Sequence, residues 1–327
     1  MSDSLPFTGE RFTPECVREI WYEHWHRYAF AARFAHGRRV LDAACGEGYG
    51  SALLARVAAS VLGADVSAAA IAHARTRYGG RPNLAFEQLD ATALDALADA
   101  SFDLVVSFET LEHVEAQERM VAGFARVLAP DGVLVISSPD RRTYSEVAGF
   151  RNEFHVRELY REELDALLAA HFPARRLFGQ KLLFQSAMWD LEAPAANVTA
   201  TTFDRATGIA ADGLGYAPLY FVAICARTDA ALPPLAGRVD LFGDAGESVY
   251  AHYDHEVRKN IAAGGVIAGL ERALAVAQAG GAAPSPASVS PAASESASAA
   301  ASSSAERGEI SSRADGLVGR LRAWLAR

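Results

Sequence analysis

The stretch Val40-Leu41-Asp42-Ala43-Ala44-Cys45-Gly46-Glu47-Gly48-Tyr49-Gly50 decides the fold of this chain. Arg39–Ala43 is apolar enough for a short buried strand, and an Ala- and Leu-rich helix is predicted over residues 49–59. A strand, a glycine loop and a helix open a doubly wound α/β domain, whose ligand lies where the loop leaves the strand. Glycines suit this loop because they let the backbone approach a ligand closely.

Acidic residues around the loop indicate what kind of ligand it binds. Asp42 lies on the strand just before the loop, and Glu47 lies inside it. These carboxylates would repel a pyrophosphate, whereas S-adenosylmethionine (SAM) carries a sulfonium and an ammonium that they would attract. The spacing G-x-G-x-G also differs from the G-x-G-x-x-G of dinucleotide-binding loops. The next predicted strand ends at Asp65, whose carboxylate can accept hydrogen bonds from both ribose hydroxyls.

Five segments resemble, in order and spacing, the motifs of class I SAM-dependent methyltransferases. They are Leu41-Asp42-Ala43-Ala44-Cys45-Gly46-Glu47-Gly48, Gly63-Ala64-Asp65-Val66-Ser67, Leu89-Asp90-Ala91, Phe102-Asp103-Leu104-Val105-Val106-Ser107 and Arg126-Val127-Leu128-Ala129-Pro130-Asp131-Gly132. The resemblance implies a Rossmann-like α/β fold with a seven-stranded, mostly parallel sheet and helices on both faces. It also implies S-adenosyl-L-methionine as the cofactor. The alternative is an ordinary α/β domain with chance glycines.

The same resemblance implies which residues bind SAM. Asp90 would accept a hydrogen bond from the adenine amino group, the Ala91 N–H would serve a ring nitrogen, and Arg27 would grip the methionine end. The implied set is Asp42, Ala43, Ala44, Cys45, Gly46, Gly48, Asp65, Val66, Asp90, Ala91, Phe108, Glu109 and Arg27.

Composition narrows the functional class. Half of the 327 residues are hydrophobic, and a net charge of −9 argues against a general nucleic-acid binder. Cys16, Cys45 and Cys225 are scattered with no C-x-x-C, so neither a disulfide framework nor a metal site is expected. The start lacks the pattern of a signal peptide, and no apolar run of membrane-spanning length is expected. We therefore expect a cytoplasmic enzyme.

Residues 39–138 are predicted to alternate between strands and helices, which indicates a parallel sheet. The strands are expected at 39–43, 61–64, 84–88, 104–108 and 133–138, and the helices near 49–59, 68–78 and 116–128. A helix over 162–170 and strands at 175–179 and 219–227 complete the domain. The family resemblance implies that these two strands form an antiparallel edge, with the last strand inserted between its neighbours.

Titratable residues follow the fourth and fifth predicted strands. If the acceptor is a hydroxyl, a general base must take its proton, and His113 and His155 are the leading candidates, with Glu109 behind them. If the acceptor is a phosphate or a carboxylate, no base is needed. A structural hydrogen-bonding role is the alternative for each histidine. Glu112 is predicted to be a solvated acid at a helix start.

Two segments narrow the resemblance to a methyltransferase-11-like branch encoded with bacterial cell-surface polysaccharide enzymes. They are Gly9-Glu10-Arg11-Phe12 with Glu23-His24-Trp25-His26-Arg27-Tyr28, and Asn152-Glu153-Phe154-His155-Val156-Arg157-Glu158-Leu159. The branch implies that residues 1–38 form a lid, rather than only a helix packed on the sheet, and that Glu23, His24 and Arg27 grip SAM or the substrate. It implies a sugar or sugar phosphate of a glycan as acceptor. A quinone-precursor O-methyltransferase and a non-catalytic SAM-binding scaffold for glycan enzymes are the alternatives.

The chain is predicted to continue beyond a methyltransferase domain at 39–228. Within that domain, residues 180–218 form a substrate-side insertion or a disordered loop. Residues 229–279 are predicted to be mainly helical, and 280–305, rich in Ala, Ser and Pro, to be a flexible linker. Residues 306–327 are predicted to form a basic amphipathic helix, which would dock on a protein partner or lie peripherally on the inner face of a membrane.

Overall fold

The computed structural model describes residues 19–188, 191–192 and 198–278. The chain divides into two compact units, Met1–Asp254 and His255–Arg327. The predicted segment Gly9-Glu10-Arg11-Phe12, the linker at 280–305 and the helix at 306–327 lie outside the described residues.

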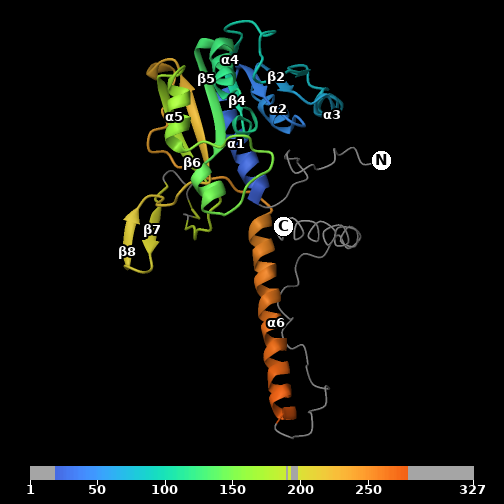
Figure 1. The fold of residues 1–327 in the computed structure, drawn as a ribbon, viewed down its shortest axis with the longest axis vertical. Coiled ribbons are helices and arrows are strands. Elements are labelled where there is room, and N and C mark those ends of the chain that lie inside the picture. Colours follow the sequence, from blue (N-terminus) through green and yellow to red (C-terminus); the bar gives the residue numbers. More distant parts are fainter. Residues whose placement is uncertain (1–18, 189–190, 193–197, 279–327) are drawn as a thin grey trace. The chain divides into compact units, whose positions relative to one another are not determined.

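A seven-stranded sheet forms the centre of the first unit, as Figure 1 shows. Its strand order is β3-β2-β1-β4-β5-β9-β6. The strands are β1 (Arg39–Ala43), β2 (Ser60–Asp65), β3 (Leu84–Gln88), β4 (Phe102–Ser107), β5 (Leu128–Pro139), β6 (Ala174–Gln180) and β9 (Tyr220–Ala226). The first five pair in parallel, while β9 runs antiparallel to both β5 and β6. The predicted parallel sheet and its inserted last strand are therefore confirmed.

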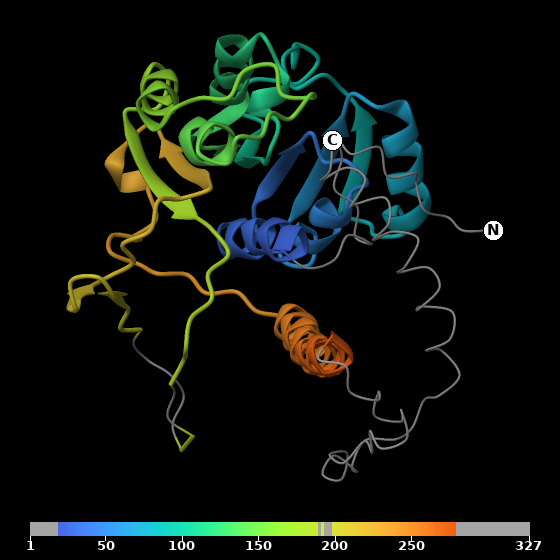
Figure 2. The same ribbon diagram turned by 60° about the horizontal axis from the view of Figure 1, so that its bottom comes forward.

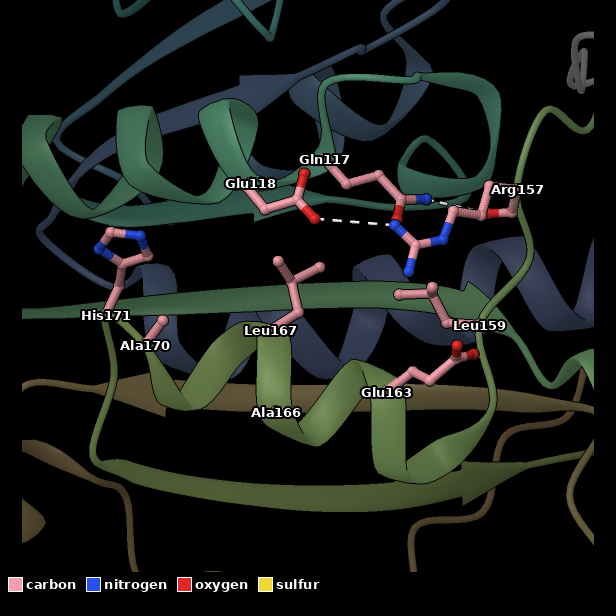
Figure 3. Close-up of a pocket in the computed structure, with 9 residues that line it drawn as sticks. All are labelled: Gln117, Glu118, Arg157, Leu159, Glu163, Ala166, Leu167, Ala170 and His171. Atoms are coloured by element: carbon pink, nitrogen blue, oxygen red, sulfur yellow. Dashed lines mark hydrogen bonds and ion pairs between the residues drawn. The ribbon is translucent and has the colours of Figure 1, made fainter.

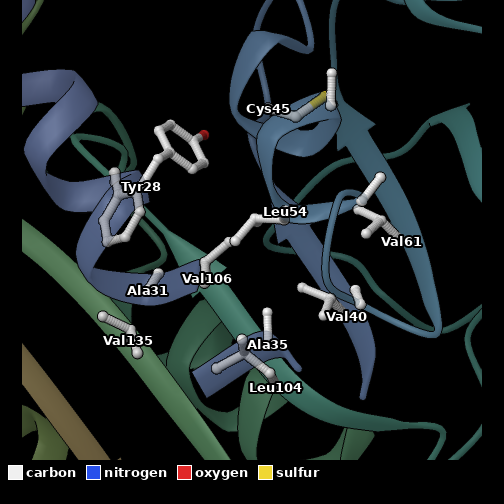
Figure 4. Close-up of a cluster of buried hydrophobic side chains, with 14 of the residues drawn as sticks. Tyr28, Ala31, Ala35, Val40, Cys45, Leu54, Val61, Leu104, Val106 and Val135 are labelled. Carbon is white, nitrogen blue, oxygen red and sulfur yellow. The ribbon is translucent and has the colours of Figure 1, made fainter. Parts of the chain in front are cut away.

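Helices cover both faces of this sheet (Figure 2). One face carries α1 (Glu19–Ala35), α2 (Tyr49–Leu54) and α3 (Ala68–Tyr78), and the other carries α4 (Gln117–Val127) and α5 (Arg161–Ala169). Successive strand residues point to opposite faces, so Leu104 and Val106 pack with the first set and Val105 with the second. Figure 4 shows the first of these clusters, with Tyr28 and Ala31 of α1 against the strands. The middle strands β1, β4 and β9 are buried along most of their length, whereas the edge strands β3 and β6 are partly exposed.

Two elements differ from their predicted bounds. The helix after the glycine loop ends at Leu54 rather than near residue 59. The Asn83 side-chain amide donates to the carbonyls of Ala55 and Ala58, at 2.9 and 3.0 Å, and so holds the chain in a turn there. The strand expected at 133–138 begins earlier, at Leu128, and Pro130-Asp131-Gly132 forms an irregularity in β5 between the pairs Phe102↔Leu128 and Leu104↔Val133.

The insertion between β6 and β9 contains an exposed two-stranded hairpin, β7 (Thr201–Asp204) and β8 (Ile209–Asp212), so part of it is ordered. The helical extension predicted at 229–279 is confirmed in its later part as α6 (Ser248–Gln278), 31 residues long, whereas residues 229–247 contain only a short 3-10 turn at Asp229–Ala231. Among the described residues, α6 is the one helix long and apolar enough to cross a membrane, with a mean hydropathy of 1.3 over 18 residues. The expectation of no such run was wrong. The run is hard to recognise in the sequence because Ala and Gly separate its large apolar residues, and because Glu271 and Arg272 interrupt it.

Candidate functional site

The loop after β1 is tied to the end of β2 by one carboxylate. The Gly46 N–H donates to Asp65 Oδ2 at 2.9 Å, and the Ser67 N–H donates to Oδ1 at 2.8 Å. An ionised carboxylate can accept about four hydrogen bonds in all. Asp65 is nearly buried at the carboxyl edge of the sheet. It therefore fits the role of accepting both ribose hydroxyls.

The loop backbone adopts left-handed conformations that leave a concave turn. Ala44, Gly46 and Gly48 have φ angles of 61°, 55° and 84°. A non-glycine residue with positive φ costs about 1–3 kcal/mol, and such residues cluster at ligand sites. Ala44 is thus the position where the loop carries backbone strain.

Gly48 and Gly50 are required by the packing of the protein itself. A Cβ on Gly48 would lie 2.6 Å from the Phe86 ring, and one on Gly50 would overlap the Tyr28 ring. The sequence interpretation, that the glycines admit a ligand, therefore has no support at these two positions. Phe86 and Tyr28 occupy the space instead and fix the start of α2.

Asp42 acts behind the loop rather than at its surface. Its carboxylate is fully buried and accepts hydrogen bonds from Tyr28 Oη at 3.0 Å and Ser51 Oγ at 2.6 Å. Burial raises the pKa of Asp42 to about 7, although the two hydroxyls oppose the rise. Glu47 is equally buried, and His73 Nε2 lies 3.7 Å from it. The expected acids are present. Because Asp42 is buried behind the loop, it would favour a cationic ligand only through the charge of its ionised form and not through direct contact.

The remaining predicted SAM residues lie on neighbouring strand ends. Asp90 is exposed after β3 and uses Oδ1 to accept from Thr92 N at 2.7 Å, with Ala91 half-buried beside it. Val66 is exposed, whereas Phe108 is buried against the Tyr28 ring at 5.0 Å. Ala43 and Cys45 are also buried, and burial raises the pKa of the Cys45 thiol well above its usual range. Cys45 is therefore an inert, packed thiol.

Arg27 connects α1 to the ends of three strands. Its guanidinium Nε donates to Gln180 Oε1 at 2.7 Å, its Nη1 lies 3.5 Å from Glu109 Oε1, and its Cζ lies 4.4 Å from the Tyr220 ring centroid. Its side chain is 1% exposed. Glu23, one turn earlier on α1, is also buried, and burial raises its pKa to about 7. Arg27 therefore fixes α1 on the sheet through contacts within the protein.

Glu109 is held in a constrained position after β4. Its backbone φ is 50°, its N–H donates to Ser137 Oγ at 3.0 Å, and Ser137 Oγ donates back to its carboxylate at 2.6 Å. The carboxylate thus bridges Ser137 of β5 and Arg27 of α1. This left-handed backbone at the carboxyl edge of β4 matches the one at Ala44 after β1.

The two predicted base candidates, His113 and His155, are in contact although they are far apart in the sequence. Phe154, which contacts the His113 ring, follows it by 41 positions. His113 Nδ1 lies 2.9 Å from the Phe154 carbonyl, and the rings of His113 and His155 are 4.9 Å apart and perpendicular. His155 Nδ1 lies 2.6 Å from Glu158 Oε1, and its Nε2 is 3.0 Å from the Asn152 amide nitrogen.

These contacts place a proton on Nδ1 of both rings, because a carbonyl and a carboxylate oxygen only accept. In its neutral form His113 then has the lone pair on Nε2. The Phe154 N–H donates to Asn152 Oδ1 at 3.1 Å, which turns the Asn152 NH₂ toward His155 Nε2. Both nitrogens of His155 therefore have protein partners.

Glu112 is not the solvated acid that its position suggested. Its side chain is 1% exposed, and neither carboxylate oxygen has a hydrogen-bond partner among the described residues. Its burial follows from the N–H groups of Val156 and Arg157, which donate to its backbone carbonyl and bring the 152–159 loop over it. Burial, and then the nearby Glu109, raise the pKa of Glu112 well above its usual range.

Glu112, His113 and His155 form a group that could hold a metal ion. Their ligand atoms lie within 4.8 Å of one another, and His113 Nε2 is 3.9 Å from Glu112 Oε1. No such group was expected from the sequence. Metal-ligand spacings are recognised when they are short and regular, whereas this one joins two distant loops.

A cavity of about 470 Å³ lies between α4 and α5 (Figure 3). It is lined by Gln117, Glu118, Arg157, Leu159, Glu163, Ala166, Leu167, Ala170 and His171. None of the residues predicted to bind SAM or to act as base lines it. The candidate site is therefore the carboxyl edge of the sheet rather than this cavity.

Several known proteins are similar to this chain. Residues 41–136 match the family model described as "Methyltransferase domain". A probable SAM-dependent methyltransferase of Mycolicibacterium smegmatis is 41% identical over 172 residues, 51% of this chain and 65% of the relative. One from Mycobacterium tuberculosis is 41% identical over 167 residues, 50% of this chain and 60% of the relative. The match thus spans less than two thirds of either relative.

More distant matches include a ubiquinone biosynthesis O-methyltransferase of Sinorhizobium fredii, 38% identical over 126 residues, 38% of this chain and 50% of the relative. Among solved structures, the YcgJ protein of Bacillus subtilis is 20% identical, with a TM-score of 0.46 over 63% of this chain and 100% of that chain.

Proposed function

We propose that this protein is a class I SAM-dependent methyltransferase that transfers the methyl group of SAM to a hydroxyl oxygen of a sugar in a cell-surface glycan. The match of residues 41–136 to a methyltransferase domain supports the first part of this proposal. The observation that carries the proposal is the meeting of His113 and His155 at the carboxyl edge of the sheet, 4.9 Å apart. A hydroxyl acceptor needs a base at this place, and an anionic acceptor does not.

The loop at 44–48 and Asp65 would hold SAM, with Asp90 toward the adenine. When bound, SAM supplies a methyl group on a sulfonium, so that the acceptor oxygen gains the carbon and the sulfur keeps the bonding pair. The protein then has two tasks: to align the acceptor oxygen and to receive its proton. The buried carboxyl groups of Asp42 and Glu47 lie behind the loop, where their ionised forms would favour the cationic reagent.

His113 is the residue we assign to receive the proton. Its Nδ1–H is held by the Phe154 carbonyl at 2.9 Å, which fixes the ring and directs the basic Nε2 away from that carbonyl. The hydroxyl proton would move to Nε2, and the imidazolium formed would favour the ionised form of Glu112, whose Oε1 lies 3.9 Å away. His155, engaged by Glu158 and Asn152, would position the loop and the acceptor.

The charges around the site favour a neutral acceptor over a sugar phosphate. Glu109, Glu112 and Glu158 lie around the two histidines, and the nearest buried cation, Arg27, already pairs with Glu109 at 3.5 Å. A phosphate brought here would meet three carboxyl groups around the histidines, against the single guanidinium of Arg27. A sugar hydroxyl can instead donate to these oxygens.

The two segments that resemble the polysaccharide-associated branch also support the glycan acceptor. The first contributes Arg27 and the second contributes His155, and both converge on residues that follow β4. The similarity to ubiquinone biosynthesis O-methyltransferases favours a second candidate, a phenolic hydroxyl of a quinone precursor.

A methyl-transfer assay with isotopically labelled SAM tests the proposal. The panel contains neutral glycosides, lipid-linked oligosaccharides, sugar phosphates and a catechol. Labelled product from a neutral sugar hydroxyl is the expected result. Product from the catechol alone would select the second candidate. Tight SAM binding without turnover on any member of the panel would instead support a SAM-binding scaffold.

A further inference from the structure

From Val257 onward, α6 exposes large apolar side chains at a density unusual for a helix in water. They are Val257, Ile261, Val266, Ile267, Leu270, Leu274 and Val276, and Ile261 is 71% exposed and Leu270 65%. No charged residue occurs from 260 to 270. Single exposed apolar residues are ordinary on a protein surface, but a contiguous set of this size marks an interaction site.

These side chains do not lie on one face. At about 100° per residue, their directions are spread around the whole helix, with no gap wider than about 80°. A helix that docks on one protein surface carries an apolar stripe and a polar opposite face, whereas a helix that is apolar all round requires apolar surroundings on every side. Such surroundings exist in a protein core or in lipid.

The protein core does not provide them here. None of the 18-residue apolar window of α6 is buried by the described residues. The helix also follows the folded domain, so it is not an N-terminal signal sequence. In the part of the chain that the structure describes, α6 therefore meets neither of the two ordinary reasons for such a helix in a soluble protein.

We propose that α6 inserts into the hydrocarbon layer of a lipid bilayer. Eighteen helical residues span about 27 Å, close to the roughly 30 Å of a bilayer core. Asp254, Glu256, Arg258 and Lys259 precede the uncharged run and suit the headgroup region. Glu271 and Arg272 lie within the window, but their charges are opposite, and the long Arg272 side chain can reach toward the surface.

The start of α6 is fixed to the domain that carries the candidate site. Val249 is buried, Ser248 Oγ donates to Asp244 at 2.6 Å, and the Tyr253 hydroxyl donates to Glu19 of α1. Insertion of the helix would thus hold the domain at the membrane. A lipid-linked acceptor would follow from this only if the proposed function holds. Insertion of α6 does not depend on the proposed function.

Flotation of the full-length protein with vesicles tests the proposal. One set of vesicles is pure phosphatidylcholine, and the other also contains phosphatidylglycerol. We expect the protein to float with both and to remain bound after a high-salt wash, because the contact is apolar. The variant V266Q/I267Q/L270Q keeps helix propensity and should lose at least tenfold in vesicle partitioning. I209Q, at an exposed apolar residue of β8, should float like the parent protein.

SAM binding by both variants controls for folding, and neither readout requires turnover. Equal flotation by the triple variant and the parent protein would overturn the proposal. So would binding that needs the anionic lipid and is released by salt, since that would indicate a basic segment such as 306–327. If the parent protein forms an oligomer without lipid and the triple variant is monomeric, a second copy of the chain covers α6. That result would also overturn the proposal.

Discussion

The backbone N–H of Gly46 and the carboxylate of Asp65 are joined by a hydrogen bond of 2.9 Å, which links the loop after β1 to the end of β2. Nineteen positions separate the two residues in the chain. Parallel pairing of β1 with β2 brings them to one edge. The glycine motif and the acid of the next strand are thus two parts of one binding surface.

Replacement of Asp65 by alanine should weaken SAM binding by about 1.5–3 kcal/mol, the range for hydrogen bonds to a charged group. Titration calorimetry measures the loss. D103A is the matched control, because Asp103 pairs with Arg39 at the opposite end of the strands. Tight binding of NAD by the parent protein, with none of SAM, would exclude the assignment.

Substitution at Gly50 tests whether the motif glycines serve packing. A Cβ there overlaps the Tyr28 ring, so Gly50→Ala should destabilise the domain by about 1–3 kcal/mol. At Gly80, no atom lies within 4 Å of an added Cβ, and Gly80→Ala should be neutral or slightly stabilising. Urea unfolding measures both. Equal free energies of unfolding for the two variants would mean that Tyr28 and α1 can shift to accept the added methyl group without loss of stability.

The sequence was sufficient for most of the fold because its signals are local. Apolar runs of strand length, the acid after β2 and the helix over Ala68–Tyr78 can each be identified within a few residues. The end of α2 could not be predicted, because it depends on the side chain of Asn83, 28 positions after Ala55. The helix propensity of residues 49–59 does not depend on a side chain so far away in the sequence.

The site was predictable in its residues but not in their states. His113 and His155 could be named from their places after two strands, yet only the fold shows that Phe154 holds one ring and Glu158 the other. Glu112 was misread for the same reason. An acid at the start of a helical turn is usually solvated, and the loop that buries it comes from 40 residues later.

The buried carboxyl of Asp42 should make stability fall as pH rises. Its pKa is raised from 3.8 to about 7, so the folded state binds this proton more tightly than the unfolded state. The stabilisation is complete below the unfolded pKa and is lost as pH rises through about 7. Asp42→Asn removes the titration, so relative to the parent it should gain on the order of a few kcal/mol between about pH 4 and 8.

Urea unfolding at several pH values measures this difference. Asp103→Asn is the control, because Asp103 is partly exposed and its pKa is lowered by Arg39, which gives the opposite sign. A pH-independent difference between the parent and Asp42→Asn would show that the buried carboxyl does not titrate in this range.

Removal of metal ions should leave turnover unchanged if His113 acts as the base. SAM is already activated, so the proposed chemistry needs an aligned hydroxyl and a proton acceptor. Dialysis against a chelator, followed by the methyl-transfer assay, should give a rate within about twofold of the untreated protein. A large loss restored by added Mg²⁺ would assign Glu112, His113 and His155 as ligands, since their atoms lie within 4.8 Å.

Substitution of the two histidines should separate their roles. Because His113 Nε2 has the lone pair, His113→Ala should lower turnover by roughly 10²–10⁴ with little effect on SAM affinity. His155→Ala should cost less, and Glu158→Gln should resemble it, since Glu158 acts only through the ring it holds at 2.6 Å. His171→Ala, beside the cavity between α4 and α5, is the control that should retain full activity. The His113→Ala variant should also lose the pH dependence that an imidazole base imposes on the rate. Full turnover by both the His113 and His155 variants would mean that the proton leaves by another route or that the acceptor is already an anion.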